Sequence, residues 1–336
     1  MRFREPASGN VSRTRVTNGT GSAPLDPQMA VVVEAMRAAQ ASAPPFADIP
    51  VATMRARAKE QFAFWNAEPP PVSSVRELDV PGHCGLRRVR VYEPLARAAS
   101  RGALVYFHGG GWVIGDLDLE DCALRHLAND SGAVIFSADY VLAPEHKFPA
   151  PVLDCVAVTE WLQRHAAESG FDPGRLAVGG ASAGANLALA TALTVRERRD
   201  SSLRFMLLFY GVYAADHSTT SHRMYGGGDF VLSSAMMERF WTLYLEDARQ
   251  AADPRAAPLH ADLTGLPPAY LCAAELDPLR DDSLALTTRL RAAGVCAECK
   301  ICPGVVHGFT LMSRSVPAAR RALQDAGAAL RDALAR

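Results

Sequence analysis

The 336-residue chain has no excess of charge of either sign. Its 35 lysines and arginines nearly balance its 36 aspartates and glutamates, which leaves a formal net charge of -1 at pH 7. A surface that binds nucleic acid or an anionic membrane is usually strongly basic, so neither partner is expected. Hydrophobic residues make up 49% of the chain, which is enough for a folded protein of this length to bury a substantial core.

A secretory signal peptide and a membrane span are also not expected. Residues 1–24 are rich in Gly, Ser, Thr and Asn without an apolar run, which predicts a disordered extension. Residues 176–195 carry no charge and are long enough to cross a bilayer. However, Gly, Ser and Asn cluster at their centre, and the apolar period changes there from that of a strand to that of a helix.

Cysteine is sparse and odd in number. Seven cysteines spread through a chain of this size favour free thiols in a reducing cytoplasm over a disulfide framework. The spacing of Cys296, Cys299 and Cys302 resembles that of metal ligands. A strand predicted over residues 295–301 would point Cys299 away from the other two, so the three could not converge and no metal is expected.

From residue 103 onward, short apolar runs alternate with helical patterns. This alternation is typical of a parallel sheet with helices on both faces. An antiparallel pair over 75–92 is expected to precede it. Strands are predicted at 103–107, 133–138, from 176, at 205–209, 269–273 and 295–301, and helices at 118–129, 152–167, up to 199 and at 319–335.

Two further regions do not fit this alternation. Apolar residues over 25–65 recur at helical spacing with a proline-containing break at 43–50, which predicts two helices. Residues 211–258 interrupt the strand pattern and contain one helix near 233–244. The first region could serve packing alone or form a lid over a site, and the second is expected to be an insertion that forms the other half of that lid.

The sequence is organised around Ser182, which lies between a strand and a helix. Gly180 and Gly184 flank it, and a backbone bend this tight requires residues with almost no side chain. The helix behind the serine directs its free N–H groups toward the place where negative charge would form. A G-x-S-x-G motif alone is weak, but the strand before it and the helix after it predict a nucleophile.

Three consecutive glycines begin at Gly109, directly after the strand at 103–107. Such a loop lets the backbone approach a substrate and expose its N–H groups. A phosphate-binding loop would continue with Lys and Ser or Thr, whereas Trp112 follows here, so an oxyanion hole is favoured. We expect Gly109, Gly110 and Ala183 to supply its N–H donors.

An acid and a histidine come later, each after a predicted strand. Asp277 and His307 would lie at the carboxyl ends of their strands, where catalytic groups gather in open α/β sheets. Asp277 before Pro278 is also typical of a helix N-cap, an alternative that stays open. Asp281 and Asp282 would then lie in the first helical turn, as partners of the helix dipole.

These groups predict a catalytic triad. Serine is a weak nucleophile until a neutral imidazole takes its proton, and a carboxylate must hold that imidazole in the right tautomer. Ser182, Asp277 and His307 would fill the three roles. Because a histidine base must be neutral, activity is expected to fall below about pH 6 to 7.

The ordered motifs resemble those of the hormone-sensitive-lipase-like esterases, the bacterial family IV group of the α/β-hydrolases. The resemblance implies the α/β-hydrolase fold, with a mostly parallel eight-stranded sheet, helices on both faces and a helical cap. It also implies hydrolysis of short- to medium-chain acyl esters through an acyl-enzyme, without a cofactor, and a possible homodimer. The matching segments are 108–111, Asp139 with Tyr140, 142–146, 180–186, 277–281 and 307–309.

Three positions depart from this family pattern. Ala181 stands where the elbow usually carries Asp, Ala185 stands where it carries Gly, and Val141 stands where Arg is common. None of them removes a predicted catalytic residue. The loss of a carboxylate beside Ser182 should make the pocket less negative.

We therefore expect a cytoplasmic serine carboxylesterase that acts on small esters. The alternatives are a non-catalytic small-molecule receptor, or an amidase or dehydratase, on the same fold. The substrate pocket is expected to include Gly111, Trp112 and Tyr213. The expected division is an extension over 1–24, cap segments at 25–70 and 211–258, and a catalytic domain formed by 71–210 and 259–336.

Overall fold

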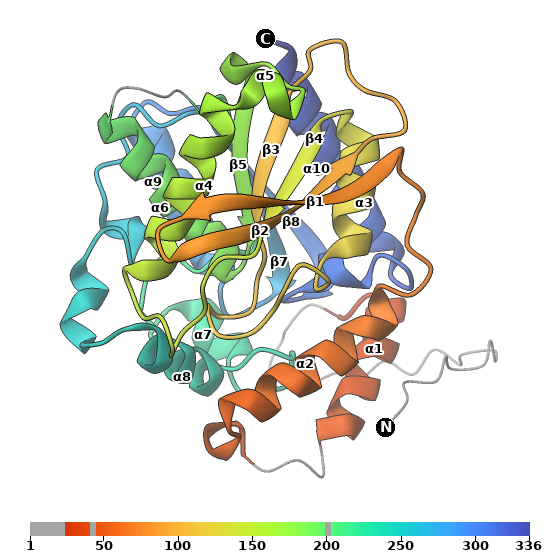
Figure 1. Ribbon diagram of the computed structural model, residues 1–336. Helices are drawn as coiled ribbons and strands as arrows, with labels where there is room; N and C mark the ends of the chain where they lie inside the picture. The colour runs from red at the N-terminus through yellow and green to blue at the C-terminus, as the bar shows by residue number, and fades with distance from the viewer. Residues whose placement is uncertain (1–23, 41–44, 199–202) are drawn as a thin grey trace.

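The computed structural model describes residues 24–40, 45–198 and 203–336. The extension predicted over 1–24 thus lies, apart from Pro24, outside the described residues. The rest forms an eight-stranded sheet with helices on both faces (Figure 1). The predicted α/β fold class is confirmed. No helix within the described residues is long and apolar enough to span a membrane.

The sheet is antiparallel at one edge and parallel elsewhere. Its strand order is β1-β2-β4-β3-β5-β6-β7-β8, with β1 antiparallel to β2, β2 antiparallel to β4, and every later pairing parallel. The strands are β1 (Ser74–Gly82), β2 (Gly85–Glu93), β3 (Ala103–Phe107), β4 (Val134–Ala138), β5 (Leu176–Ala181), β6 (Phe205–Phe209), β7 (Ala269–Leu276) and β8 (Ala297–Val306).

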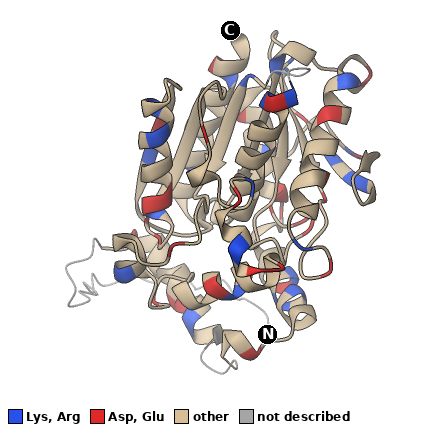
Figure 2. Cartoon of the chain, turned by 90° about the vertical axis from the view of Figure 1, so that its left-hand side faces the viewer, with Lys and Arg blue, Asp and Glu red and all other residues tan. Residues whose placement is uncertain are grey.

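The central strands are apolar because both of their faces are covered. One face packs against α4 (Ala150–Arg164), α6 (Ala183–Arg198) and α9 (Arg280–Ala292), and the other against α3 (Asp121–Ser131) and α10 (Pro317–Ala335). Figure 2 shows charged residues around the central strands β3 to β6, which themselves carry none.

Four helices gather at one end of the sheet, where the parallel strands finish (Figure 1). They are α1 (Pro27–Gln40), α2 (Val51–Trp65), α7 (Thr220–Tyr225) and α8 (Ser234–Tyr244). The Ser233 hydroxyl caps α8 by accepting the Met236 N–H. The remaining short helices are α5 (Ala166–Ser169) and 3-10 turns at Phe46–Asp48, Pro173–Arg175, Ala248–Ala252, Pro258–His260 and Phe309–Met312.

Strands β7 and β8 run further than predicted, up to the residues that precede Asp277 and His307. The pattern predicted that β8 would stop before Pro303, but it continues to Val306. The pairing shifts register between Ala274 and Leu276, and the Gly304 N–H donates to Glu275 Oε2 instead of the ladder. An edge strand with such a bulge can hold a proline, because one side of its backbone needs no partner.

Candidate active site

Ser182 lies at a sharp bend between β5 and α6, with a φ of 54°. The two glycines around it are required by space. A Cβ on Gly184 would lie 1.9 Å from the carbonyl oxygen of Phe107, and a Cβ on Gly180 would lie 2.4 Å from the backbone of Gly184. The predicted elbow can therefore form only because both positions are glycine.

The structure brings the three residues predicted as a triad into one line. The Ser182 hydroxyl lies 2.9 Å from His307 Nε2, and His307 Nδ1 lies 2.7 Å from Asp277 Oδ2. Since Asp277 can only accept when ionised, Nδ1 carries the proton and Nε2 accepts from the serine. Ser182 and Asp277 are buried, and the His307 side chain is only 13% exposed.

Both oxygens of the Asp277 carboxylate are used. Oδ2 accepts from His307, while Oδ1 accepts the Leu279 N–H at 2.9 Å. Helix α9 begins at Arg280, so the turn that Asp277 makes precedes the helix and the aspartate is not its N-cap. On the other side of the imidazole, the ring of Tyr210 contacts His307 edge-on, with centroids 5.0 Å apart. The imidazole is thus oriented from two directions.

One of the three predicted oxyanion donors, the Gly109 N–H, is wrong. The Gly109 N–H donates at 2.8 Å to Oε1 of Glu120, so it points away from the place where an oxyanion would form. Within the described part of the chain, the N–H groups of Gly110, Gly111 and Ala183 make no hydrogen bond. Glu120 lies eleven residues after Gly109 in a segment that no motif marks, so the sequence alone did not predict this bond.

A cavity of about 1010 Å³ opens above the serine. Its lining is mostly apolar and comes from α1, α2, the 3-10 turn at Phe46–Asp48, α8 and the catalytic loops. Ser182, Gly110, Gly111 and His307 form part of its wall, as does Glu120. Apolar contributors include Met36, Phe46, Met54, Phe62, Met236, Met237, Phe240, Leu311 and Met312.

Two residues expected in this pocket lie elsewhere. Trp112 is fully buried with a φ of 63°, and its ring stacks on Tyr244 at 4.3 Å. Tyr213 is also fully buried and does not line the cavity. Both predictions are corrected, because these large rings anchor α8 and the segment after β6 instead of facing the substrate space. Gly111 lines the cavity as expected.

The acids expected as helix-dipole partners have further contacts. Asp282 is buried and accepts the N–H groups of Tyr213 and Ala214 at 2.7 and 3.2 Å, and burial raises the pKa of its carboxyl to about 7. Asp281 accepts the Ser221 N–H at 2.8 Å. The first turn of α9 therefore anchors the segment that leads from β6 to α7.

The cysteines are dispersed. Cys302 is buried beside Cys272, with their sulfurs 3.6 Å apart, whereas Cys296 is exposed and Cys299 is partly buried. Among the residues that the structure describes, no group of three or more His, Cys, Asp or Glu side chains could hold a metal ion.

Known proteins are similar to this chain over most of its length. The family model described as "alpha/beta hydrolase fold" matches residues 104–311. An acetyl esterase of Salmonella choleraesuis is 35% identical over 290 residues, which cover 85% of this chain and 88% of the relative. The carboxylesterase NlhH of Mycobacterium tuberculosis is 40% identical over 250 residues, which cover 73% of this chain and 78% of the relative.

Solved structures are similar over nearly the whole length. An esterase from Pyrobaculum calidifontis has a TM-score of 0.85 at 36% identity, covering 92% of this chain and 99% of its own. An ester hydrolase from the metagenome of Lake Arreo, solved with a bipyridine phosphonate derivative, has a TM-score of 0.88 at 35% identity, covering 93% and 100%. The chain therefore belongs to the α/β-hydrolase fold family, in its hormone-sensitive-lipase-like group of esterases.

Proposed function

We propose that the chain is a serine carboxylesterase in which Ser182 is the nucleophile. The observation that carries the proposal is the line of contacts from Ser182 through His307 to Asp277, at 2.9 and 2.7 Å, on the floor of an apolar cavity. A serine activated in this way attacks carbonyl carbon, and esters are the substrates named for the relatives above.

The reaction then has two halves. Ser182 Oγ bonds to the ester carbonyl carbon while its proton passes to His307 Nε2, and Asp277 stabilises the imidazolium that results. The tetrahedral intermediate collapses, the alcohol leaves with that proton, and an acyl-enzyme remains. Water attacks the acyl-enzyme through the same base, which releases the carboxylic acid and restores the serine.

The negative oxygen of each intermediate needs preorganised donors. Gly110, Gly111 and Ala183 are the candidates, because their N–H groups are free within the described residues and the first two line the cavity. Ala183 also begins α6, whose dipole favours negative charge at this end. Losing one such donor typically costs about 3 to 4 kcal/mol of transition-state stabilisation.

We propose short- to medium-chain acyl esters as substrates and a cap made of two segments, 25–70 and 211–258. The apolar lining favours acyl chains over charged groups, and residues from both segments contribute to it. Phe46 from the first segment contacts Phe240 from the second, with ring centroids 5.5 Å apart. Binding that increases with acyl length until the cavity is filled would support both parts of this proposal.

A cytoplasmic location and a homodimer are further proposals. All seven cysteines are free thiols, which suits a reducing compartment. Strand β8 lies at the edge of the sheet, where no further strand of the described residues pairs with it, and this edge offers a surface for a second copy. Sedimentation of the purified protein tests the dimer.

The test of the function is hydrolysis of p-nitrophenyl esters of increasing acyl length by the wild type and by Ser182→Ala. We expect turnover by the wild type and loss of turnover in the variant. Matched anilides, assayed in parallel, distinguish an esterase from an amidase. If the folded wild type binds esters without cleaving any of them, the proposal fails and a receptor function takes its place.

A further inference from the structure

Glu120 is a buried acid for which the reaction above has no role. Glu120 is only 2% exposed, yet it forms part of the cavity wall. Oε1 accepts the Gly109 N–H at 2.8 Å and Oε2 accepts the Tyr106 hydroxyl at 2.6 Å. A buried carboxyl is costly unless its oxygens are satisfied, so its position is fixed by these two donors.

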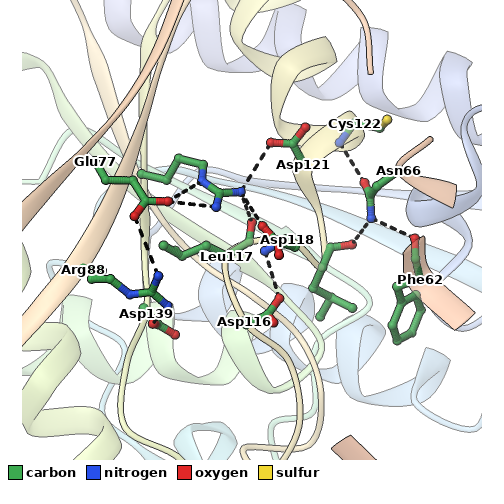
Figure 3. Close-up of polar contacts among 12 residues, drawn as sticks. Phe62, Asn66, Glu77, Arg88, Asp116, Leu117, Asp118, Asp121, Cys122 and Asp139 are labelled. Carbon is green, nitrogen blue, oxygen red and sulfur yellow. Dashed lines mark hydrogen bonds and ion pairs between the residues drawn. The ribbon is translucent and has the colours of Figure 1, made fainter. Parts of the chain in front are cut away.

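The segment that carries Glu120 is itself tightly held (Figure 3). Asn66, at the end of α2, donates to the Leu119 carbonyl at 3.0 Å and accepts the Cys122 N–H at 2.9 Å, so it brackets Glu120 on both sides. Arg90 on β2 donates to the Leu117 carbonyl at 3.2 Å. The carboxylate is therefore presented from a rigid support.

Gly109 lies between this carboxylate and the nucleophile. A Cβ built on Gly109 would be 3.6 Å from Glu120 Oε1 and 3.6 Å from the Ser182 Cβ. Glu120 fixes the N–H of Gly109, and His108 Nδ1 contacts the Gly109 carbonyl oxygen at 2.7 Å. Because each peptide unit is planar, the held Gly109 carbonyl sets the direction of the Gly110 N–H, while Glu120 fixes the peptide unit just before it.

We propose that Glu120 is a positioning residue of the oxyanion hole: its carboxyl holds the Gly109 peptide so that the N–H groups of Gly110 and Gly111 face the carbonyl above Ser182. This inference rests on the proposed esterase function and deepens it. Glu120 does not touch the reacting atoms. It acts through the loop, so its loss should affect the transition state more than substrate binding.

The test replaces Glu120 by two side chains of similar length. Glu120→Gln keeps an oxygen that accepts from Gly109 and an N–H₂ group that can donate to Tyr106, whereas Glu120→Met keeps the bulk without an acceptor. Asp121→Asn is the matched control, because Asp121 is the adjacent buried acid and contacts the Tyr92 hydroxyl, Arg125 and Arg90, all outside the glycine loop. Should Glu120→Met not fold, Glu120→Asp withdraws the acceptor by one methylene.

The readout is kcat and KM for an ester and for its thionoester, in which sulfur replaces the carbonyl oxygen. Sulfur is a weak acceptor, so an intact hole favours the oxygen ester and a misaligned hole loses that preference. For Glu120→Met we expect kcat on the ester to fall about 10-fold or more, with KM within about 3-fold and a reduced oxygen-to-sulfur preference. Glu120→Gln and Asp121→Asn should keep the wild-type preference.

An unchanged oxygen-to-sulfur preference in Glu120→Met would overturn the proposal, and so would the same result in Glu120→Asp where that variant is used. This holds even if the Tm of the variant has fallen, because a purely structural role predicts lower stability with an unchanged preference. Equal loss of preference in Asp121→Asn would overturn it as well. A wild type without esterase activity would instead refute the proposed function on which it rests, so the two failures are distinguishable.

Discussion

The Phe240 ring lies directly against Gly111, so that a Cβ on Gly111 would be 2.4 Å from the Cγ of that ring. Gly111 also has a φ of 59°, a conformation that disfavours side chains. Helix α8 thus contacts Gly111 through the ring of Phe240. We expect the orientation of the proposed oxyanion donors to depend on this contact between the proposed second cap segment and the loop.

Substitution of Gly111 should therefore damage catalysis. Gly111→Ala must displace the Phe240 ring or the loop backbone, and we expect kcat to fall by about 10- to 1000-fold, the range seen when an oxyanion donor is lost or misplaced. Gly227→Ala is the matched control, because nothing lies within 4 Å of a Cβ there. Equal activity of the two variants on p-nitrophenyl esters would show that the loop tolerates the change.

Removal of the Asp277 charge should leave the fold intact and slow the chemistry. Asp277→Asn presents a group that no longer favours the imidazole tautomer needed at Ser182, and we expect kcat to fall about 10⁴-fold. Asp281→Asn, four residues further on, should keep most of the activity because Asp281 bonds the Ser221 N–H and not the histidine. An Asp277→Asn enzyme within tenfold of the wild type would remove Asp277 from the mechanism.

Glu120 should make the stability of the protein depend on pH. Burial raises the pKa of its carboxyl from 4.5 to about 7. The unfolded chain therefore releases this proton at lower pH than the native state, so the stability contributed by Glu120 is complete below about pH 4.5 and declines as the pH rises to about 7. Burial also raises the pKa of the facing phenols, Tyr106, Tyr140 and Tyr210, which stay neutral throughout.

The corresponding measurement is Tm between pH 4.5 and 8 for the wild type and Glu120→Gln, whose amide does not titrate. Relative to this variant, the wild type should lose stability as the pH rises. Parallel Tm curves would mean that the Glu120 carboxyl has an ordinary pKa in the native state.

Arg55 should hold the first cap segment against the glycine loop. From α2 it donates to the carbonyl oxygens of Val113 and Ala143, both at 2.9 Å, and forms an ion pair with Glu145. Arg55→Met should lower the free energy of unfolding by about 2 kcal/mol, because two buried carbonyls lose a charged donor.

The control for Arg55 is Arg249→Met. Arg249 also forms an ion pair, with Asp247, but its side chain is 91% exposed and bonds no carbonyl among the described residues. Exposed pairs contribute little, so urea unfolding of this variant should match the wild type. If both variants unfold at the same urea concentration as the wild type, Arg55 does not secure the cap.

Much of the fold could be predicted from local pattern. Strands β3 and β6 begin and end where their apolar runs do, at 103–107 and 205–209, because a strand covered on both faces must be apolar throughout. The C-terminal end of strand β8 was predicted too early, because proline and glycine ordinarily end a strand. A bulge at the sheet edge is not visible in one sequence.

The candidate site was also predictable only in part. Ser182, Asp277 and His307 stand out because each follows a strand, and the structure brings them together. Gly109 was wrongly expected to be an oxyanion donor. Its N–H donates instead to Glu120, which lies eleven residues away in a loop without a recognisable motif.

In the proposed mechanism, an acyl group is carried on Ser182 Oγ during turnover. Its most direct test is mass spectrometry of the protein acid-quenched while it hydrolyses a p-nitrophenyl ester, followed by peptide mapping. We predict one added acyl mass on the peptide that contains Ser182, and no adduct and no turnover in Ser182→Ala. An adduct on another residue, or ester hydrolysis that persists in Ser182→Ala, would show that Ser182 is not the nucleophile.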